Sequence, residues 1–462
     1  MKKLTVLLLL TPAILSCNFV TRALGLAPVE TPLSPTPFFS ETATPEPPLG
    51  PDEPTRTPRP TATPFVLRLE KIDPLPDNCN ESPLGLPAEK IVEVAYVPAG
   101  FCFYGEIDTF EMDDHLYVVQ SLGDEAAFFI TDVTDPQNPA IVGAWQWNDF
   151  TYTADVKAFA QGGRRYIVLS MEPFIKLCGV AIVDVTDPAN PVLVGNYDSK
   201  NTDAADKWCD THTTQVGRDE NGDGAFVYVS SVESADVRVL DIRDLSNVYE
   251  INHYTHPNAG FAKENFVHDS TIVDDRVYLA YWSAGVVILD RQQVESGAEV
   301  EPLNPPNSID PGGLQIHHSY PTEDGNFLFV EDEVNYTGEQ SQLLLFDIRD
   351  LSAPKEVLAI KLEQPYSSPH NLLVSGDLLY VGWYSDGVRV FQYDVSNPDD
   401  PQVEPYAFKA TRPEKTTGVF GSDIFDSIYG VRLHDCEIDG RPMTCIYASD
   451  LTRGLLILAM ER

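Results

Sequence analysis

The stretch that decides the fold is Gly179-Val-Ala-Ile-Val-Asp-Val-Thr-Asp-Pro-Ala-Asn-Pro-Val-Leu-Val-Gly-Asn-Tyr197. Two apolar runs rich in β-branched residues flank a Thr-Asp-Pro turn and a second proline, which predicts two strands joined by a turn. An upstream copy is Phe128-Phe-Ile-Thr-Asp-Val-Thr-Asp-Pro-Gln-Asn-Pro-Ala-Ile-Val-Gly143. Weaker copies begin at Val237, Val286, Leu343 and Val388. Repetition of this kind predicts an architecture built from one small unit.

Each copy belongs to a longer unit with a constant order of parts. A first strand, often opened by His or Asp, is followed by a second strand carrying Tyr or Phe, by the apolar run and by an outer strand. Four strands in roughly 45 to 55 residues are typical of a β-propeller blade. We count seven units, whose first strands begin near Ile107, Asp155, His212, His268, His318, His370 and Tyr429. The sequence therefore predicts an all-β, seven-bladed β-propeller.

The seventh unit lacks an outer strand, because its third strand, Gly454–Met460, is the last one in it. Upstream of the first unit, Pro87–Tyr96 resembles an outer strand that has no unit of its own. We predict that this N-terminal strand completes the last blade and closes the ring. Closure would hide edge strands that otherwise pair with other chains.

The apolar run ending at Asp184 and its relatives resemble the LVIVD repeat of bacterial and archaeal cell-surface proteins, a β-propeller family. The resemblance covers roughly residues 90 to 462 and is weakest in the fourth and seventh units. It implies a propeller fold and a surface location. It implies no defined reaction.

The N-terminal residues predict export rather than a part of the fold. Residues 1–17 place Lys2 and Lys3 before a short apolar run that ends at Cys17. This resembles a bacterial lipoprotein signal, in which the chain is cleaved before the cysteine and the cysteine is lipidated. We expect an extracytoplasmic protein anchored through Cys17, with plain secretion as the alternative. Residues 18–64 are rich in Pro and Thr and predict a disordered linker, and residues 65–462 form the predicted propeller.

Composition excludes some classes of partner. The formal net charge is −39 and the isoelectric point is about 4.3, which argues against nucleic acid and against a basic patch on an anionic membrane. We therefore expect the lipid anchor to be the sole membrane contact, and we expect a monomer. The small-molecule or protein ligand is left open.

Six cysteines remain after Cys17, and an even number in an exported chain favours disulfide bonds. The candidate pairs are Cys436–Cys445 across a short turn, Cys79–Cys102 and Cys178–Cys209.

Histidines recur at one place in the repeat. Tyr278 follows His268 by ten positions, and Tyr380 follows His370 by ten. Counting back from the second strand in this way assigns one structural position to Asp155, His212, His268, His318 and His370. Since side chains alternate along a strand, we expect His317 to point the opposite way from His318.

First strands line the central channel of a propeller, so these residues predict a ring of imidazoles at one mouth. Loop carboxylates predicted to reach the same face are Glu172, Glu233, Glu331 to Glu333, Asp386 and Asp450, of which Glu233, Glu333 and Asp386 are the candidates for the mouth. Neutral imidazole binds zinc, copper or iron, and three adjacent histidines with one carboxylate are the predicted first shell of a divalent transition metal. The alternative is that each histidine bonds to a neighbouring blade and packs the channel wall.

A second candidate site is Asp219-Glu-Asn-Gly-Asp-Gly224, in which Asp219, Asn221 and Asp223 have the spacing of calcium-loop oxygens. The glutamate of an EF-hand is absent, since Ser230 stands at its position. A structural Ca²⁺ site and a plain polar turn are both consistent with this sequence.

Two functions remain open from the sequence. The first is a lipid-anchored surface propeller that binds a ligand or protein partner at the histidine-lined mouth without turnover. The second is a metal-dependent hydrolase, lyase or oxidase that uses the channel histidines. The sequence shows no phosphate loop, no dinucleotide fingerprint and no serine nucleophile elbow.

Overall fold

The computed structural model describes residues 90–98, 103–123, 126–147, 151–173, 178–260, 265–310, 315–333, 342–361, 368–411 and 427–461. The predictions for the signal segment, for Cys17, for the linker at 18–64 and for the pair Cys79–Cys102 lie outside these ranges. Strands dominate the described ranges, whose only α-helix is α2 (Arg291–Glu295). No helix in them is long and apolar enough to cross a membrane.

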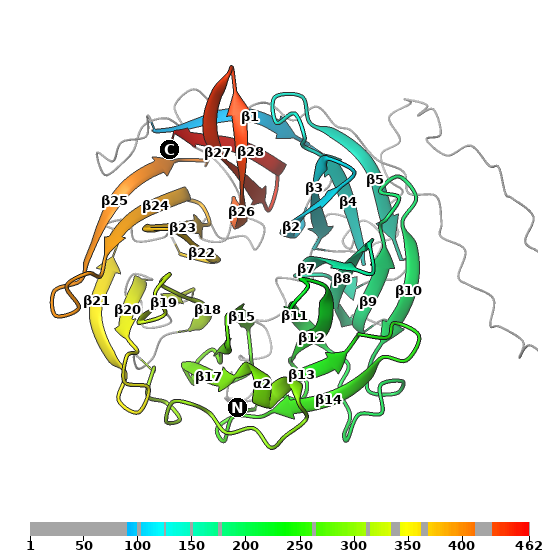
Figure 1. Cartoon of the computed structure of the whole chain (residues 1–462), viewed down its shortest axis with the longest axis vertical. Coiled ribbons are helices and arrows are strands. Elements are labelled where there is room, and N and C mark those ends of the chain that lie inside the picture. The colour runs from blue at the N-terminus through cyan, green and yellow to red at the C-terminus, as the bar shows by residue number, and fades with distance from the viewer. Residues whose placement is uncertain are drawn as a thin grey trace, which may run out of the picture.

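The strands form seven antiparallel sheets arranged as blades around a central channel (Figure 1). Blade 1 contains β2 (Tyr104–Met112), β3 (His115–Leu122), β4 (Ala127–Asp132) and β5 (Ala140–Gln146). Blade 2 contains β7 (Val156–Gln161), β8 (Arg164–Pro173), β9 (Gly179–Asp184) and β10 (Val192–Tyr197), with β6 (Thr151–Tyr152) paired to β8. Blade 3 contains β11 (Thr211–Arg218), β12 (Gly224–Ser231), β13 (Asp236–Asp241) and β14 (Tyr249–Tyr254).

Blade 4 contains β15 (Asp269–Val273), β16 (Arg276–Ala280) and β17 (Val286–Asp290). Blade 5 contains β18 (Ile316–Pro321), β19 (Phe327–Asp332), β20 (Gln342–Asp347) and β21 (Lys355–Lys361). Blade 6 contains β22 (Leu372–Ser375), β23 (Leu378–Trp383), β24 (Gly387–Asp394) and β25 (Gln402–Lys409). Blade 7 contains β26 (Ile428–Ile438), β27 (Arg441–Asp450), β28 (Gly454–Glu461) and β1 (Ile91–Val97). The prediction of a seven-bladed propeller is confirmed.

The N-terminal strand closes the ring as predicted. β1 pairs antiparallel with β28, from Ile91 opposite Met460 to Val97 opposite Leu455. Apolar side chains of β1 enter the clusters that blade 7 shares with its two neighbours, since Ile91 packs with residues of blade 6 and Val97 with residues of blade 1. A strand that is remote in sequence thus buries apolar surface on both sides of the last blade.

Blade 4 departs from the repeat where its sequence departs. The Asp-Pro turn that leads to an outer strand elsewhere is replaced by Asp290-Arg-Gln-Gln, and Asp290 caps α2 by accepting a hydrogen bond from the Gln293 N–H. The chain then returns along β17, where Leu303 N–H donates to the Ile288 carbonyl at 2.8 Å. This returning segment covers the edge of β17 without forming a fourth strand.

Two disulfide bonds are present in the described chain. Cys178–Cys209 joins the start of blade 2's third strand to the start of blade 3, and Cys436–Cys445 crosses the β26–β27 hairpin. Both pairs match the sequence prediction.

Closure by β1 predicts unequal effects of two neighbouring truncations. Ile91 is 3% exposed, whereas Val92 is 41% exposed. Ile91→Ala should lower the free energy of unfolding by about 2–4 kcal/mol, because it leaves a cavity between blades. Val92→Ala should change it by less than about 0.5 kcal/mol. Chemical unfolding of the two variants checks this, and equal effects would contradict the closure role of β1.

Candidate metal centre

Four histidines occupy the same register position in four consecutive blades. In blades 3 to 6 the second-strand aromatic pairs with a first-strand residue, and a histidine lies three positions before that residue. The paired residues are Gln215 with Tyr228, Thr271 with Tyr278, Tyr320 with Phe329, and Leu373 with Tyr380. Counting back three gives the positions of His212, His268, His317 and His370.

The position in blade 5 corrects the sequence alignment, which selected His318 and expected His317 to point elsewhere. The pairing of Tyr320 with Phe329 spans nine residues, against seven for Thr271 with Tyr278, so the hairpin of blade 5 is two residues longer. The register also shifts between Ile316 and Ser319, and such a bulge re-aims side chains. The longer turn and the bulge together place His317 with the other histidines.

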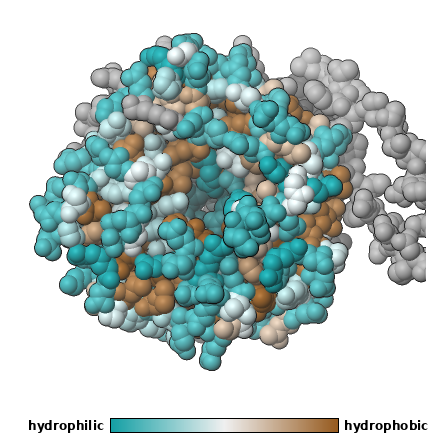
Figure 2. All heavy atoms as spheres, in the orientation of Figure 1, coloured by the Kyte–Doolittle hydropathy of each residue, from teal (hydrophilic) through white to brown (hydrophobic). Residues whose placement is uncertain are grey.

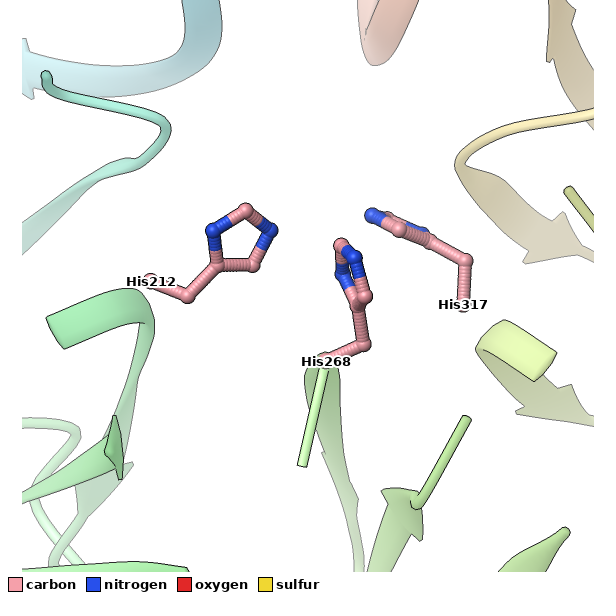
Figure 3. Close-up of side chains that lie close together, drawn as sticks. All are labelled: His212, His268 and His317. Atoms are coloured by element: carbon pink, nitrogen blue, oxygen red, sulfur yellow. The ribbon is translucent and has the colours of Figure 1, made fainter. Parts of the chain in front are cut away.

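The four rings form a continuous arc in the channel. Ring centroids lie 4.1 Å apart for His212 and His268, 4.4 Å for His268 and His317, and 3.9 Å for His317 and His370. Figure 3 shows the rings of His212, His268 and His317 converging from three blades on a common space. One ring nitrogen from each of these three can be chosen so that all lie within 4.8 Å of one another. A second such group contains His317, Glu333 and His370.

Hydrogen bonds at the outer nitrogen orient two of the rings. His212 Nδ1 bonds to the Glu172 carboxylate, and His370 Nδ1 donates to the Tyr429 carbonyl at 2.7 Å. Their Nε2 atoms therefore carry a free lone pair toward the cluster whenever the imidazoles are neutral. Metal-binding histidines are oriented by this type of bond.

His317 is buried beside Glu331 with unused bonding capacity. His317 is 1% exposed and Glu331 is fully buried, with 3.3 Å between Nδ1 and a carboxylate oxygen. Within the described residues, neither ring nitrogen of His317 has a hydrogen-bond partner. His268 Nδ1 and His212 Nε2 are likewise buried without one. Buried polar atoms left in this way cost free energy unless something binds them.

The electrostatic environment keeps three of the four imidazoles neutral. Burial, reinforced by neighbouring histidines, holds the pKa of His268 and of His317 well below the usual value. Burial also holds the pKa of His370 well below it, against the hydrogen bond to Tyr429. Burial opposes charge on His212 as well, but the adjacent Glu172 outweighs it and raises the pKa of His212. Neutral imidazole is the form that binds a metal.

The two other residues of the sequence alignment, His318 and Asp155, lie outside this cluster with their polar atoms already bonded. His318 Nδ1 accepts from the Leu372 N–H at 3.2 Å, which leaves Nε2–H to donate to the Thr271 hydroxyl at 3.0 Å. Burial lowers the pKa of His318 to about 3. Asp155 accepts from Lys157 and from the Thr214 N–H. The sequence count assigned Asp155 to this position in error. In blade 2, Phe159 of the first strand pairs with Tyr166, and the residue three positions before Phe159 is 156 rather than 155.

These bonds belong to a polar belt inside the channel that draws on all seven blades. It comprises Glu106, Asp108, Asp155, Lys157, Thr214, Asp269, Thr271, His318, Asn371 and Arg432. The blade 7 to blade 1 link is Arg432 Nε donating to Asp108 at 3.1 Å, and Asn371 donates to Glu106 from blade 6. The belt joins the inner strands to one another, so its members stabilise the wall of the channel.

Of the predicted mouth carboxylates, Glu333 alone joins the histidines. One Glu333 oxygen lies 3.8 Å from His370 Nε2 and accepts from the Tyr384 hydroxyl at 2.5 Å, and burial raises the pKa of Glu333 to about 7. Asp386 is buried in an ion pair with Arg389, and Glu233 is at the surface beside Lys207. The sequence analysis missed Tyr152 as a neighbour of the cluster. The dipeptide His317-His318 was the signal in the sequence that the register of this strand was ambiguous.

The calcium candidate has the geometry of a polar turn at the tip of the β11–β12 hairpin. Asp219 Oδ1 accepts from the N–H groups of Asn221 and Asp223 at 2.8 and 3.0 Å. Asp223 Oδ2 accepts from the Gly162 N–H at 2.9 Å. Carboxylate oxygens that cap backbone donors account for this sequence without an ion.

A further depression of about 580 Å³ lies at the β2–β3 and β4–β5 turns, at the other ends of the strands from the histidines. It is lined by Glu111, His115, Asp135, Arg165 and His434, among others. Both histidines of this depression already have hydrogen-bond partners, since His115 bonds to Asp132 and His434 to Glu111.

The fold and the channel define the class of this protein: a seven-bladed β-propeller with a histidine cluster in its channel. The chain carries an LVIVD repeat, because residues 178–199 match the family model described as "LVIVD repeat". These residues run from the start of β9 to just beyond β10 in blade 2. A comparison with curated proteins finds no match.

Solved structures share the fold at low identity. One is a putative 6-phosphogluconolactonase from Bacteroides uniformis, with 11% identity, 76% of this chain and 98% of that chain covered, and a TM-score of 0.50. A periplasmic gluconolactonase from Pseudomonas aeruginosa has 15% identity, coverage of 65% and 86%, and a TM-score of 0.48. YCF48 bound to a D1 peptide has 9% identity, coverage of 80% and 94%, and a TM-score of 0.47. At these identities the likeness concerns the fold alone.

The polar belt predicts a large stability effect inside the channel and a small one at the surface. Lys157→Met leaves the Asp155 carboxylate, 2% exposed, without its cation, and should lower the free energy of unfolding by about 3 kcal/mol. Arg164→Met breaks the pair with Asp184, whose arginine is 57% exposed, and should cost less than about 1 kcal/mol. Denaturant unfolding of both variants tests the difference, and a surface pair that matters as much as the buried one would contradict it.

Proposed function

We propose that this protein binds a transition-metal ion in the propeller channel through His212, His268 and His317, and that the ion is the point at which an external ligand binds. The observation that carries the proposal is the convergence of three ring nitrogens from three blades within 4.8 Å. Buried, unpartnered nitrogens on His212, His268 and His317 support it. Unbonded imidazole nitrogens gain no hydrogen bond by converging, whereas a shared cation would bind all three.

The donor set indicates which ions fit. Neutral imidazoles suit zinc, copper, iron or nickel and are poor ligands for calcium or magnesium. The Glu172 carboxylate bonds to the ring of His212, where it raises ligand basicity. His370 borders the group through its contact with His317 and offers its Nε2 as a fourth donor. Three protein ligands with an open position are typical of metal centres that exchange an outside ligand.

The mouth of the channel is accessible at one side of the cluster. His212 and His268 are half-buried, whereas His317 and His370 are both 1% exposed. The space-filling view shows a hollow at the centre of the propeller face (Figure 2). Of the four histidines, His212 and His268 therefore have the side chains that solvent reaches most readily.

Metal analysis tests the proposal. Purified full-length protein, incubated with zinc, copper or iron and passed through a desalting column, should retain about one ion per chain. His317→Ala should lose the ion, because His317 belongs to both candidate groups. His253→Ala is the matched control, since His253 lies on the outer strand β14 and is 38% exposed.

A second control uses His318, which is adjacent to His317 in the sequence but lies outside the cluster. His318→Ala should keep the ion, although it removes belt hydrogen bonds and lowers stability. Wild-type protein that retains no transition metal would overturn the proposal. Loss of the ion in His318→Ala but not in His317→Ala would overturn the assignment of ligands.

A second candidate function is a metal-dependent hydrolase, lyase or oxidase. It is favoured by Glu333, which lies beside His370 and accepts a hydrogen bond from the Tyr384 hydroxyl, so that a carboxylate able to hold a proton borders the cluster. A bound metal ion would supply an activated water or a polarised carbonyl. The chain's own contribution would be proton transfer at the Glu333 carboxylate.

Turnover of esters or lactones by the metal-loaded protein, compared with a metal-stripped sample, separates the two functions. If the protein is a hydrolase, Glu333→Gln should lower kcat by about 10²-fold or more while the ion is retained. Metal-loaded protein without turnover of any substrate class would leave ligand binding as the function.

The setting is extracytoplasmic. Two disulfide bonds indicate an exported protein, since such bonds persist in oxidising compartments. We propose in addition that Cys17 carries a lipid that holds the propeller at the cell surface, which the apolar run before Cys17 supports. Metabolic labelling with a fatty acid, lost in Cys17→Ser, tests the anchor.

A further inference from the structure

Aromatic side chains flank the accessible side of the histidine cluster. Tyr152 and Phe266 each have a ring centroid 6.4 Å from that of His212, and both are half-buried. Tyr152 is carried by β6, which pairs with Glu172 of β8, and Phe266 lies two residues before His268. A ligand that reaches the cluster therefore passes two aromatic rings.

A second row of rings supports the first. Phe103 stacks on Tyr152 at 5.8 Å and 14° between ring planes, and Trp282 stacks on Phe266 at 6.2 Å and 22°. Trp282 also stacks on His268 at 4.3 Å. Packing against a buried second ring fixes the orientation of Tyr152 and Phe266, so each offers a rigid flat face.

The arc of histidines leaves one sector of the cluster to aromatic residues. The imidazoles come from blades 3 to 6, and the described residues of blades 7, 1 and 2 contribute Tyr429, Phe103 and Tyr152 in their place. Tyr429 lies 3.9 Å from His370 by ring centroids. An ion held by the imidazoles thus has its open side toward aromatic surface.

Charge limits the ligand further. The Glu172 carboxylate is bonded to His212 at the accessible side of the cluster. The whole chain has a formal net charge of −39. This field opposes the approach of anions to the mouth.

We propose that the ligand of the metal centre is a neutral, planar aromatic molecule with an oxygen donor, which contacts Tyr152 and Phe266 while the oxygen binds the ion. This inference rests on the proposed metal centre. It assigns Tyr152 and Phe266 as specificity-determining residues: they contact the ring of the ligand, whereas the histidines hold the ion.

Two amides of matched size and donor test the inference. Benzamide and cyclohexanecarboxamide are both neutral and both offer a carbonyl oxygen, but only the ring of benzamide is aromatic. Titration into the Co²⁺-loaded protein, followed by calorimetry and by the visible spectrum of the cobalt, should show benzamide binding about 3- to 10-fold more tightly.

Variants locate the source of the preference. Tyr152→Leu and Phe266→Leu should reduce the benzamide preference to less than about 2-fold while each retains its cobalt. Tyr406→Leu, on the outer strand β25, is the control and should keep it, because the Tyr406 ring contacts Lys90 and not the channel. Circular dichroism and the cobalt content show that each variant is folded.

The outcomes separate the two proposals. Equal binding of the two amides by cobalt-loaded wild-type protein would overturn the aromatic ligand and leave the metal centre standing. A preference that persists in both leucine variants would overturn the roles of Tyr152 and Phe266. Failure of the wild-type protein to bind cobalt would overturn the metal centre itself, and the ligand inference with it.

Discussion

The structure depends on hydrogen bonds that cross from each inner strand to the next inside the channel. Inner strands carry polar side chains into a space that water reaches only from the ends, so those groups must bond to one another. Thr214 N–H donates to Asp155 between blades 3 and 2, Thr271 bonds to His318 between blades 4 and 5, and Leu372 N–H donates to His318 between blades 6 and 5. Each such bond fixes the angle between neighbours as well as satisfying a buried group.

The contrast between this belt and the histidine cluster is the main argument for a functional site. In the belt, His318 and Asp155 use their polar atoms on protein partners. In the cluster, residues at an equivalent depth keep nitrogens that no described protein group satisfies, and His317 keeps two. The belt also has a buried atom without a partner, Asn371 Oδ1, but the unpartnered nitrogens of the cluster lie together on three adjacent histidines. The proposed binding of an ion and its ligand would satisfy these nitrogens.

The sequence was sufficient for the fold and insufficient for the site. Repetition of the run around Val180 to Asp184 specified the blade, and the count of seven first strands specified seven blades, because each unit must bury its apolar faces against the next. The orphan strand near Ile91 specified closure. The site required residue-level register, which a fixed count cannot supply when turns differ in length. The hairpin of blade 5 is longer than that of blade 4, so the count selected His318 in place of His317.

The partners of individual histidines were also beyond the sequence. Glu172 reaches His212 from the neighbouring blade, and Tyr152 is positioned by a two-residue strand with no pattern of its own. Such contacts depend on how blades pack side by side, which local periodicity does not encode.

The pairing of β1 with β28 has a consequence for biosynthesis. Ile91 emerges from the ribosome early, but its partner Met460 appears only after every intervening blade has been made. The ring therefore cannot close until the last strand has been made, and any blades that fold earlier have open edges, which are hazards for aggregation. The segment that bears His212 to His370 is complete before that point, so blades 3 to 6 can associate into an arc while the circle is still open.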